Sequence, residues 1–264
     1  MGETGRRVVQ ALPAIAFAVF IVVEGGLVFA LGCALVGVVC LRELYEMMRR
    51  ARPIDIAGFM AVAAMCLTAL YGEKRQLLLV LVLAFPLTFF LAVSRPRREN
   101  VSWGVAATFL GIVWIGLALA HAVFLRELPH GGALVVDTLI GTFIGDTCAY
   151  FGGRAWGRTP LAPRISPNKT IAGLVSGVAG GTLWFWLFGL AYQHEWFGGN
   201  DRLLIGLAVA LATPVGDLFE SLVKRDLGVK DTGRLFGAHG GALDRLDAVL
   251  FSIVAAYYVS ATLL

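Results

Sequence analysis

The 264-residue chain carries little charge, since Asp, Glu, Lys and Arg make up 15% of it, whereas a soluble domain has about 25%. Hydrophobic residues account for 58% of the chain, and the mean hydropathy is +0.78. Length alone predicts one or two soluble domains, but this composition excludes them and indicates a polytopic membrane protein. The net charge of +4 matters less than the places where the charges lie.

Metal-binding patterns of cysteine and histidine are also missing. The four cysteines lie in apolar stretches without a CxxC motif, so we interpret them as small core residues. The four histidines form no set with them that would suit zinc. The cysteines therefore give no information about the redox compartment.

Long apolar runs fill most of the chain. A membrane-spanning helix needs roughly 20 apolar residues. Windows of that length predict an all-α protein with about nine spans, at residues 8–23, 26–46, 54–72, 76–94, 103–123, 132–152, 170–192, 203–222 and 244–263. Glu24-Gly25-Gly26 interrupts the first apolar run, so we expect residues 1–33 to contribute spans and not a cleaved signal peptide.

The basic residues are divided unevenly between the two sides of this arrangement. Loops on one side hold 17 of the 22 Lys and Arg residues, and loops on the other side hold four. The positive-inside rule then predicts a bacterial-type inner-membrane protein with its N-terminus inside and its C-terminus outside. We expect residues 1–130 to be a helical scaffold with homodimer contacts, and residues 131–264 to be the catalytic region facing the cytoplasm.

Polar residues concentrate in one segment near the C-terminus, residues 221–247, which holds nine charged side chains, one His and five Gly. Charge beside apolar helices is costly and marks a functional candidate. Lys and Arg bind phosphate, Gly allows close backbone approach and Asp binds hard cations, so the segment predicts nucleotide-phosphate chemistry at a membrane surface. A basic loop that binds anionic lipid headgroups is the simpler alternative, but its aspartates would repel such lipids.

Four carboxylates on three predicted helices have the placement of a metal site. Asp217 and Asp146 each lie about 14 residues into their predicted spans, while Asp244 and Asp247 share one face of the last helix. Ligands that offer only oxygen suit Mg²⁺ or Mn²⁺, and a pair of such cations is a known solution for nucleotidyl transfer. We therefore predict one or two cations at these four residues. For Asp146 the alternative is a structural carboxylate paired with a basic residue such as Arg154.

Another polar segment precedes the predicted span 170–192. Ser166 or Asn168 is expected to cap that helix, with Pro167 near its first turn. A helix start that carries Ser, Lys and Thr suits a phosphate, because free backbone N–H groups and the helix dipole both favour an anion. An ordinary helix start beside an ordinary cytoplasmic lysine is the alternative.

The segment Ser221–Asp247 resembles the signature of the phosphatidate cytidylyltransferase family, also called CDP-diacylglycerol synthases. The elements S-x-x-K-R, K-D, G, H-G-G, D-R and D are all in place. Asp146–Tyr150 with Gly152, and Ser166–Thr170 with Gly173, resemble two further blocks of that family, so the likeness covers roughly residues 140–250. One departure is Gly237, where many members have Pro.

The resemblance implies an enzyme of phospholipid biosynthesis that uses a divalent metal to convert CTP and phosphatidic acid into CDP-diacylglycerol and pyrophosphate. It associates Asp217, Asp244 and Asp247 with the metal-dependent centre, and we expect Lys224 to act with them. Nucleic acid is not expected as a partner. The residues expected to bind phosphate or the lipid headgroup carry charge or hydrogen-bond donors, and they are Ser166, Asn168, Lys169, Thr170, Arg225, Lys230, His239, Gly240, Gly241 and Arg245.

Other functions would use some of the same residues. A CTP-dependent kinase for polyprenol or phytol would transfer the γ-phosphate, and the complete signature argues against it. An ion-coupled transporter would spread polar residues along a path through the membrane, whereas here they gather on one side. A scaffold that binds anionic lipid would show no turnover.

Overall fold

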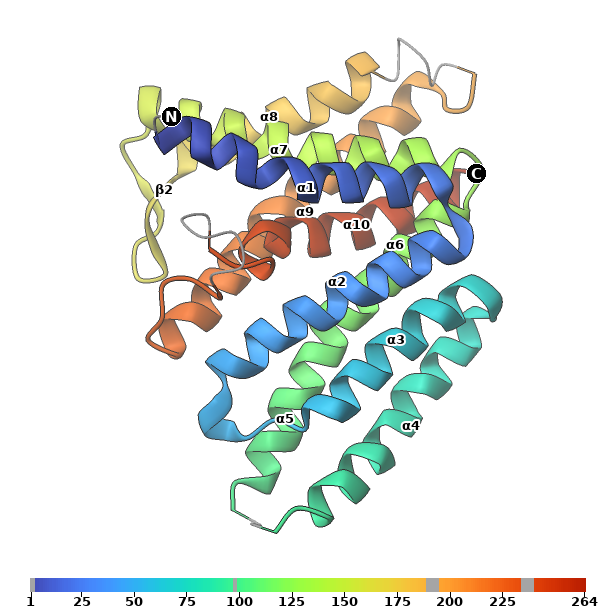
Figure 1. Cartoon of the computed structure of the whole chain (residues 1–264). Coiled ribbons are helices and arrows are strands. Elements are labelled where there is room, and N and C mark those ends of the chain that lie inside the picture. Colours follow the sequence, from blue (N-terminus) through green and yellow to red (C-terminus); the bar gives the residue numbers. More distant parts are fainter. Residues whose placement is uncertain (1–2, 97–98, 189–194, 234–239) are drawn as a thin grey trace. The chain divides into compact units, whose positions relative to one another are not determined.

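The structure is a computed structural model that describes residues 3–96, 99–188, 195–233 and 240–264 (Figure 1). Within these ranges the regular secondary structure is helical apart from one two-stranded hairpin. It divides into two compact units, which are residues 1–127 with 229–245, and residues 128–228 with 246–264. Most of the charged C-terminal segment therefore belongs to the first unit, whereas Asp217 and Asp247 belong to the second.

The first unit is a bundle of helices that follow one another along the chain. Helix α2 lies beside α3 and α6, and α3 also packs against α4 (Figure 1). The segments α5, η2 and α6 run on without a break, with η2 as a π-helical turn. The elements are α1 (Glu3–Glu24), α2 (Gly26–Met47), η1 (Arg49–Ala51), α3 (Asp55–Tyr71), α4 (Lys74–Val93), α5 (Val101–Gly111), η2 (Ile112–Gly116) and α6 (Leu117–Glu127).

Hydrogen bonds and close packing fix α2 within this bundle. The Tyr45 hydroxyl donates to the Thr108 carbonyl oxygen at 2.9 Å, and the Thr108 hydroxyl accepts from the Ile54 N–H at 2.7 Å. A Cβ on Gly111 would lie 2.9 Å from the Tyr45 ring, so a larger residue there would push the two helices apart. The cytoplasmic end predicted for α2, which carries Glu43, is therefore held firmly.

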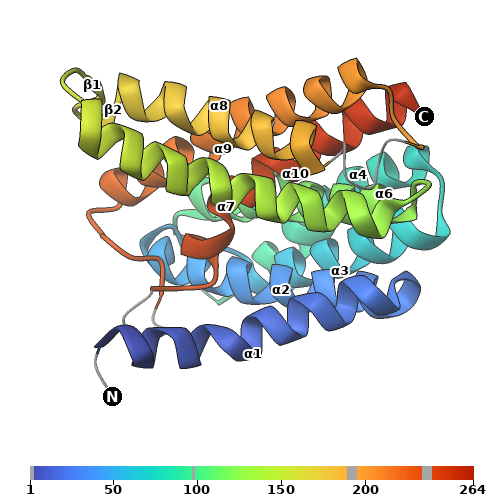
Figure 2. The ribbon, with the colours of Figure 1, turned by 90° about the horizontal axis from the view of Figure 1, so that it is seen from above.

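The second unit is built on three consecutive helices and the last one. It contains α7 (Gly131–Trp156), the hairpin of β1 (Pro160–Ala162) and β2 (Ser166–Thr170), α8 (Ile171–Phe188), α9 (Gly199–Asp226) and most of α10 (Leu243–Leu263). Helix α7 lies along α8, and α8 lies along α9 (Figure 2). The antiparallel hairpin fills the turn from α7 to α8.

Small residues let α7 and α8 approach closely. A Cβ on Gly152 would collide with the Ser176 side chain, and one on Gly173 would lie 2.8 Å from the Ala149 carbonyl oxygen. Lipid gives no hydrophobic drive for helix association, so such contacts between small residues are what hold membrane helices together. Gly152 and Gly173, which belong to the family-like blocks, therefore have a packing role.

The helices agree with the predicted membrane spans. Within the described residues, six helices are long and apolar enough to cross a membrane, and residues 12–24, 55–71 and 171–187 form shorter apolar helices. Each predicted span overlaps one of these, and Gly25 turns the chain between the first two with a φ of 69°. The prediction of an all-α membrane protein is confirmed. The count of nine spans, the orientation, the boundary at residue 130 and the homodimer stay predictions.

Candidate active site

Four elements of the second unit bring charged side chains together. Asp146 in α7 interacts electrostatically with Lys169 in β2, with Asp217 in α9 and with Asp247 in α10. Asp247 also interacts with Asp217, and with Glu220 and Lys224, which lie one and two turns further along α9. We call these six residues the carboxylate–lysine cluster. They come from segments far apart in the sequence, so the fold, and not local sequence, assembles them.

Lys169 and Asp217 form an ion pair in which both side chains are partly exposed. Ser221, one helical turn beyond Asp217, directs its hydroxyl to the other carboxylate oxygen of Asp217 at 3.4 Å. The two carboxylate oxygens of Asp217 thus face the Lys169 ammonium group and the Ser221 hydroxyl. Such a carboxylate is placed to bind a further positive group as well.

Glu220 is the member of the cluster that the site prediction left out. Its side chain is 1% exposed, and its Oε2 accepts a hydrogen bond from the Lys224 ammonium at 2.5 Å. Glu220 also lies beside Asp247. The spacing of Asp217, Glu220 and Lys224 along one helix face was visible in the sequence, but burial of Glu220 was not.

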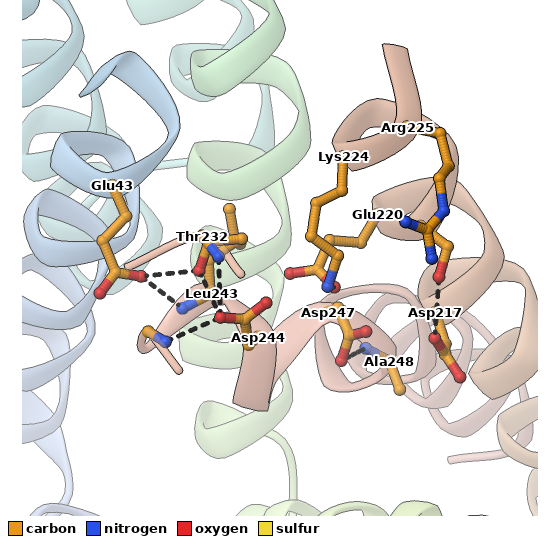
Figure 3. Close-up of polar contacts among 12 residues, drawn as sticks. Glu43, Asp217, Glu220, Lys224, Arg225, Thr232, Leu243, Asp244, Asp247 and Ala248 are labelled. Carbon is orange, nitrogen blue, oxygen red and sulfur yellow. Dashed lines mark hydrogen bonds and ion pairs between the residues drawn. The ribbon is translucent and has the colours of Figure 1, made fainter. Parts of the chain in front are cut away.

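The close approach of α9 and α10 depends on Gly216. A Cβ at this position would collide with the Asp247 carbonyl oxygen and would lie 3.0 Å from Cα of Ala248. Because Gly216 precedes Asp217, the missing side chain allows the backbone of α10 to reach the level of Asp217. The Asp247 carboxylate is held there by the Ala248 N–H, which donates to Oδ1 at 2.8 Å (Figure 3).

The alternative for Asp146, a pair with Arg154, does not match the contacts of the arginine. Arg154 donates to the Tyr150 hydroxyl at 3.2 Å, while Asp146 interacts with Lys169 and with two carboxylates of the cluster. Asp146 therefore belongs with the residues of the predicted site.

The start of α8 differs from the expected helix cap. Ser166 and Asn168 lie in strand β2, and α8 begins at Ile171. The cap is Thr170, whose hydroxyl accepts a hydrogen bond from the Gly173 N–H at 3.1 Å. The prediction that Ser166 or Asn168 caps the helix is wrong, because the segment pairs with β1 and Pro167 lies in a strand and not in a first turn. The spacing of Thr170 and Gly173 in the sequence could have predicted this cap.

The remaining basic and polar residues of the predicted site lie near the cluster in sequence but differ in their surroundings. Arg225 donates from Nε to the Ile165 carbonyl oxygen at 3.3 Å and so joins α9 to the hairpin. Asn168 and Arg225 are exposed, and Ser166 is half-buried.

In the first unit, Lys230 and Arg245 are exposed, and Gly240 has a φ of 81°. His239 lies outside the described residues.

Asp244 has a different environment from the other three predicted metal ligands. It lies in the first unit, where its Oδ2 accepts hydrogen bonds from the Gly241 N–H at 2.7 Å and from the N–H and hydroxyl of Thr232, both at 2.9 Å (Figure 3). Gly241, expected to donate its N–H to phosphate, donates it to Asp244 here. Whether Asp244 also binds metal stays a prediction.

The donor chemistry of the second unit fits a divalent cation. Asp146, Asp217 and Asp247 offer only oxygen, and their charges repel one another, so a cation among them would relieve that repulsion. Within the described ranges, however, no three His, Cys, Asp or Glu side chains are arranged as a metal cluster. A metal at these residues, Mg²⁺ or Mn²⁺, single or paired, therefore stays a prediction.

The fold and the cluster together define an integral membrane protein in which carboxylates and lysines gather among apolar helices. Comparison with known proteins gives the family. Residues 5–263 match the Cytidylyltransferase family, and the chain belongs to it. It is therefore a nucleotidyltransferase.

Curated relatives cover most of the chain. A phosphatidate cytidylyltransferase of Mycobacterium bovis is 33% identical over 97% of this chain and 90% of its own length. One from Synechocystis is 31% identical over 98% of this chain and 97% of its own length. One from Aquifex aeolicus is 35% identical over 67% of this chain and 65% of its own length.

Proposed function

We propose that this nucleotidyltransferase is a phosphatidate cytidylyltransferase that converts CTP and phosphatidic acid into CDP-diacylglycerol and pyrophosphate. The observation that carries the proposal is the carboxylate–lysine cluster, which places cation-binding and phosphate-binding groups among the helices of one unit. Relatives named for this activity over nearly the full chain length support the choice of substrates.

The reaction is a displacement at phosphorus. A phosphate oxygen of phosphatidic acid forms a bond to the α-phosphorus of CTP, while the bond from that phosphorus to the bridging oxygen of the β-phosphate breaks. Pyrophosphate leaves with the electron pair of that bond. The nucleophile is already anionic, so no general base is required. The main barrier is repulsion between two polyanions, and catalysis must come from positioning and charge neutralisation.

Lys169 and Lys224 are the residues of the cluster suited to the phosphates. Each is held by a carboxylate, Lys169 by Asp217 and Lys224 by Glu220. An ammonium group has three donors, so each lysine can keep its carboxylate partner while it donates to a phosphate oxygen. Held in this way, the lysines present positive charge at a fixed place, which is how enzymes stabilise charge in a transition state.

The metal dependence belongs to the same proposal. Asp217 and Asp247, with Asp146 near them, would hold Mg²⁺, which supplies charge neutralisation for the reacting phosphates when it is bound. The contacts of Asp217 with Lys169 and Ser221 would orient its carboxylate for that role. Asp244 stays a predicted ligand, and His239 and Gly240 stay predicted phosphate donors.

The substrates set the location of the site. Phosphatidic acid keeps its two acyl chains in the bilayer, so the second unit must open sideways to lipid. CTP is available in the cytoplasm, and the positive-inside pattern predicts the same side for the loops that flank the cluster. We therefore propose an inner-membrane enzyme whose site faces the cytoplasm.

One assay tests the reaction and its nearest rival. The purified protein is incubated in detergent with phosphatidic acid, Mg²⁺ and CTP labelled on either the α- or the γ-phosphate. We expect α-label in CDP-diacylglycerol and γ-label in pyrophosphate. Transfer of γ-label to a polyprenol or phytol would instead identify a lipid kinase. No labelled lipid with either substrate, across Mg²⁺, Mn²⁺ and several detergents, would overturn the proposal.

A further inference from the structure

Glu43, near the end of α2, accepts two backbone hydrogen bonds from residues about 200 positions later in the chain. Its Oε1 accepts from the Ala242 N–H at 2.9 Å. Its Oε2 accepts from the Leu243 N–H at 2.9 Å and lies 3.2 Å from the Thr232 hydroxyl, whose one proton it shares with Asp244 (Figure 3). All of these residues belong to the first unit. In the sequence Glu43 lies close to Arg42, Arg49 and Arg50, which favours local charge pairs, but the structure places it against these distant residues.

The contacts of Glu43 stabilise the beginning of α10. This helix starts at Leu243, and the first N–H groups of a helix have no partner within it. A negative charge there is favourable because it accepts these hydrogen bonds and lies at the positive end of the helix dipole. Caps come mostly from the residue just before the helix, but here a distant helix supplies the carboxylate.

Asp244 completes the arrangement from within the segment. Its Oδ2 accepts from Thr232 and Gly241, and the Thr232 hydroxyl lies between this oxygen and the Glu43 carboxylate. Thr232 is buried, at 5% exposure. The two carboxylates therefore tie Thr232 to Gly241 and to the start of α10, and all of these residues lie within the signature Ser221–Asp247.

Two glycines of the signature make room for Glu43. A Cβ on Gly233 would lie 2.6 Å from Glu43 Oε1 and 2.8 Å from its Cδ, and the three nearest atoms all belong to Glu43. A Cβ on Gly241 would collide with Glu43 Oε2. The Glu43 carboxylate is held by the N–H groups of Ala242 and Leu243, so it cannot move aside without losing these hydrogen bonds. The Glu43 carboxylate therefore explains why both positions are glycine, without any role for substrate.

We propose that Glu43 is a positioning residue of this enzyme. It holds the signature segment Ser221–Asp247 at two places, Thr232–Gly233 and Gly241–Leu243. It acts through these residues and does not touch substrate. The part of the proposal that concerns catalysis rests on the proposed function, whereas the part that concerns the segment does not. Helix α2 thereby holds part of the signature segment, although its region was expected to be scaffold alone.

Hydrogen exchange measured on the purified protein without substrate tests the hold on the segment. Glu43→Gln keeps the size of the side chain but leaves one carbonyl oxygen where two N–H groups now meet two carboxylate oxygens. We expect at least about 10-fold faster exchange of the amides of Thr232 and Gly241–Leu243, since their protection follows local opening. Exchange elsewhere in α2 and α7 should stay unchanged. The matched control is Glu46→Gln on the same helix, because Glu46 is exposed and pairs with the exposed Arg49 at 3.5 Å.

A double-mutant cycle tests the link to catalysis at a temperature where thermal unfolding shows every variant folded. Gly233→Ala should lower kcat/KM for CTP at least about 10-fold in the Glu43 background, but less than about 2-fold in a Glu43→Ala background, because contacting residues are not additive. Glu46→Gln should keep the unmodified rate. Additive effects, or unchanged exchange in Glu43→Gln, would overturn the proposal. If no CDP-diacylglycerol forms even in the unmodified enzyme, the proposed function fails while the exchange result still decides the role of Glu43.

Discussion

Lys169 and Asp217 form an ion pair that joins the β-hairpin before α8 to the middle of α9. The pair connects the polar segment that precedes α8 to α9, the helix that carries the start of the charged segment 221–247. It also places a lysine expected to bind phosphate against a carboxylate expected to bind metal. One contact thus links the lysine to the charge balance of the whole cluster, and substitution of either partner should have a distinct effect.

Loss of the lysine should reduce the rate by removing charge from the phosphates. We expect Lys169→Met to lower kcat/KM by about 10²-fold or more, as loss of one transition-state donor does in other enzymes. Arg164→Met is the matched control, because it removes one positive charge from an exposed position of the same hairpin. Initial rates of CDP-diacylglycerol formation decide the outcome. Equal effects of the two substitutions would mean that only the overall positive charge of the hairpin matters.

Loss of the aspartate should change the metal dependence. Asp217→Asn and Asp247→Asn each remove one negative oxygen from the proposed cation site, so we expect at least about 10²-fold lower activity and a higher Mg²⁺ concentration for half-maximal rate. Asp226→Asn serves as the control because Asp226 is exposed at the end of α9. A Mg²⁺ titration of each variant gives the answer. If Asp217→Asn keeps the unmodified rate and titration, Asp217 is not a ligand.

The sequence predicted the helices well because a membrane helix is specified by a local property. Each predicted span overlaps a helix, and apolar length alone determines that result. It also identified Asp146, Lys169, Asp217 and Asp247, which the structure brings together in one unit. Charge beside apolar runs was sufficient to find these residues, although not to pair them.

Contacts between distant segments could not be predicted from the sequence. Glu43 lies beside Arg42 in the sequence, and nothing local distinguishes it from an ordinary surface charge. Its partners come 189 to 200 positions later, so only the packed fold reveals them. The start of α8 was misplaced for a related reason, because pairing with β1 makes Ser166–Thr170 a strand. Local capping rules do not include a partner strand.

Stability should depend on the buried pair of Glu220 and Lys224. Removal of one partner of a buried ion pair costs about 3–5 kcal/mol, because the other charge stays buried. Glu220 is 1% exposed and the Lys224 side chain 16%, so Lys224→Met should destabilise more than Glu220→Gln. The double substitution should be more stable than the sum of the single effects predicts. Thermal unfolding in detergent measures all three. Additive losses would show that the two residues act separately.

The final prediction uses two glycines that each precede an aspartate of the cluster. Gly216→Ala places a Cβ against the backbone of Asp247 and Ala248, and backbone cannot move aside as a flexible side chain can. Helix α10 must shift away from Asp217, so we expect at least about 10-fold lower kcat/KM, with a lower unfolding temperature, as overpacking costs about 1–3 kcal/mol.

Gly145→Ala is the matched control for that shift. Its Cβ would lie 3.4 Å from the Gly177 carbonyl oxygen, an ordinary contact, so the α7–α8 packing should accommodate it. Both variants place alanine one residue before a cluster aspartate, Asp217 or Asp146, and both should favour helix equally. A difference in rate between them therefore reports the approach of α9 to α10. If Gly145→Ala lowers the rate as much as Gly216→Ala does, the spacing of α9 and α10 is not what limits the site.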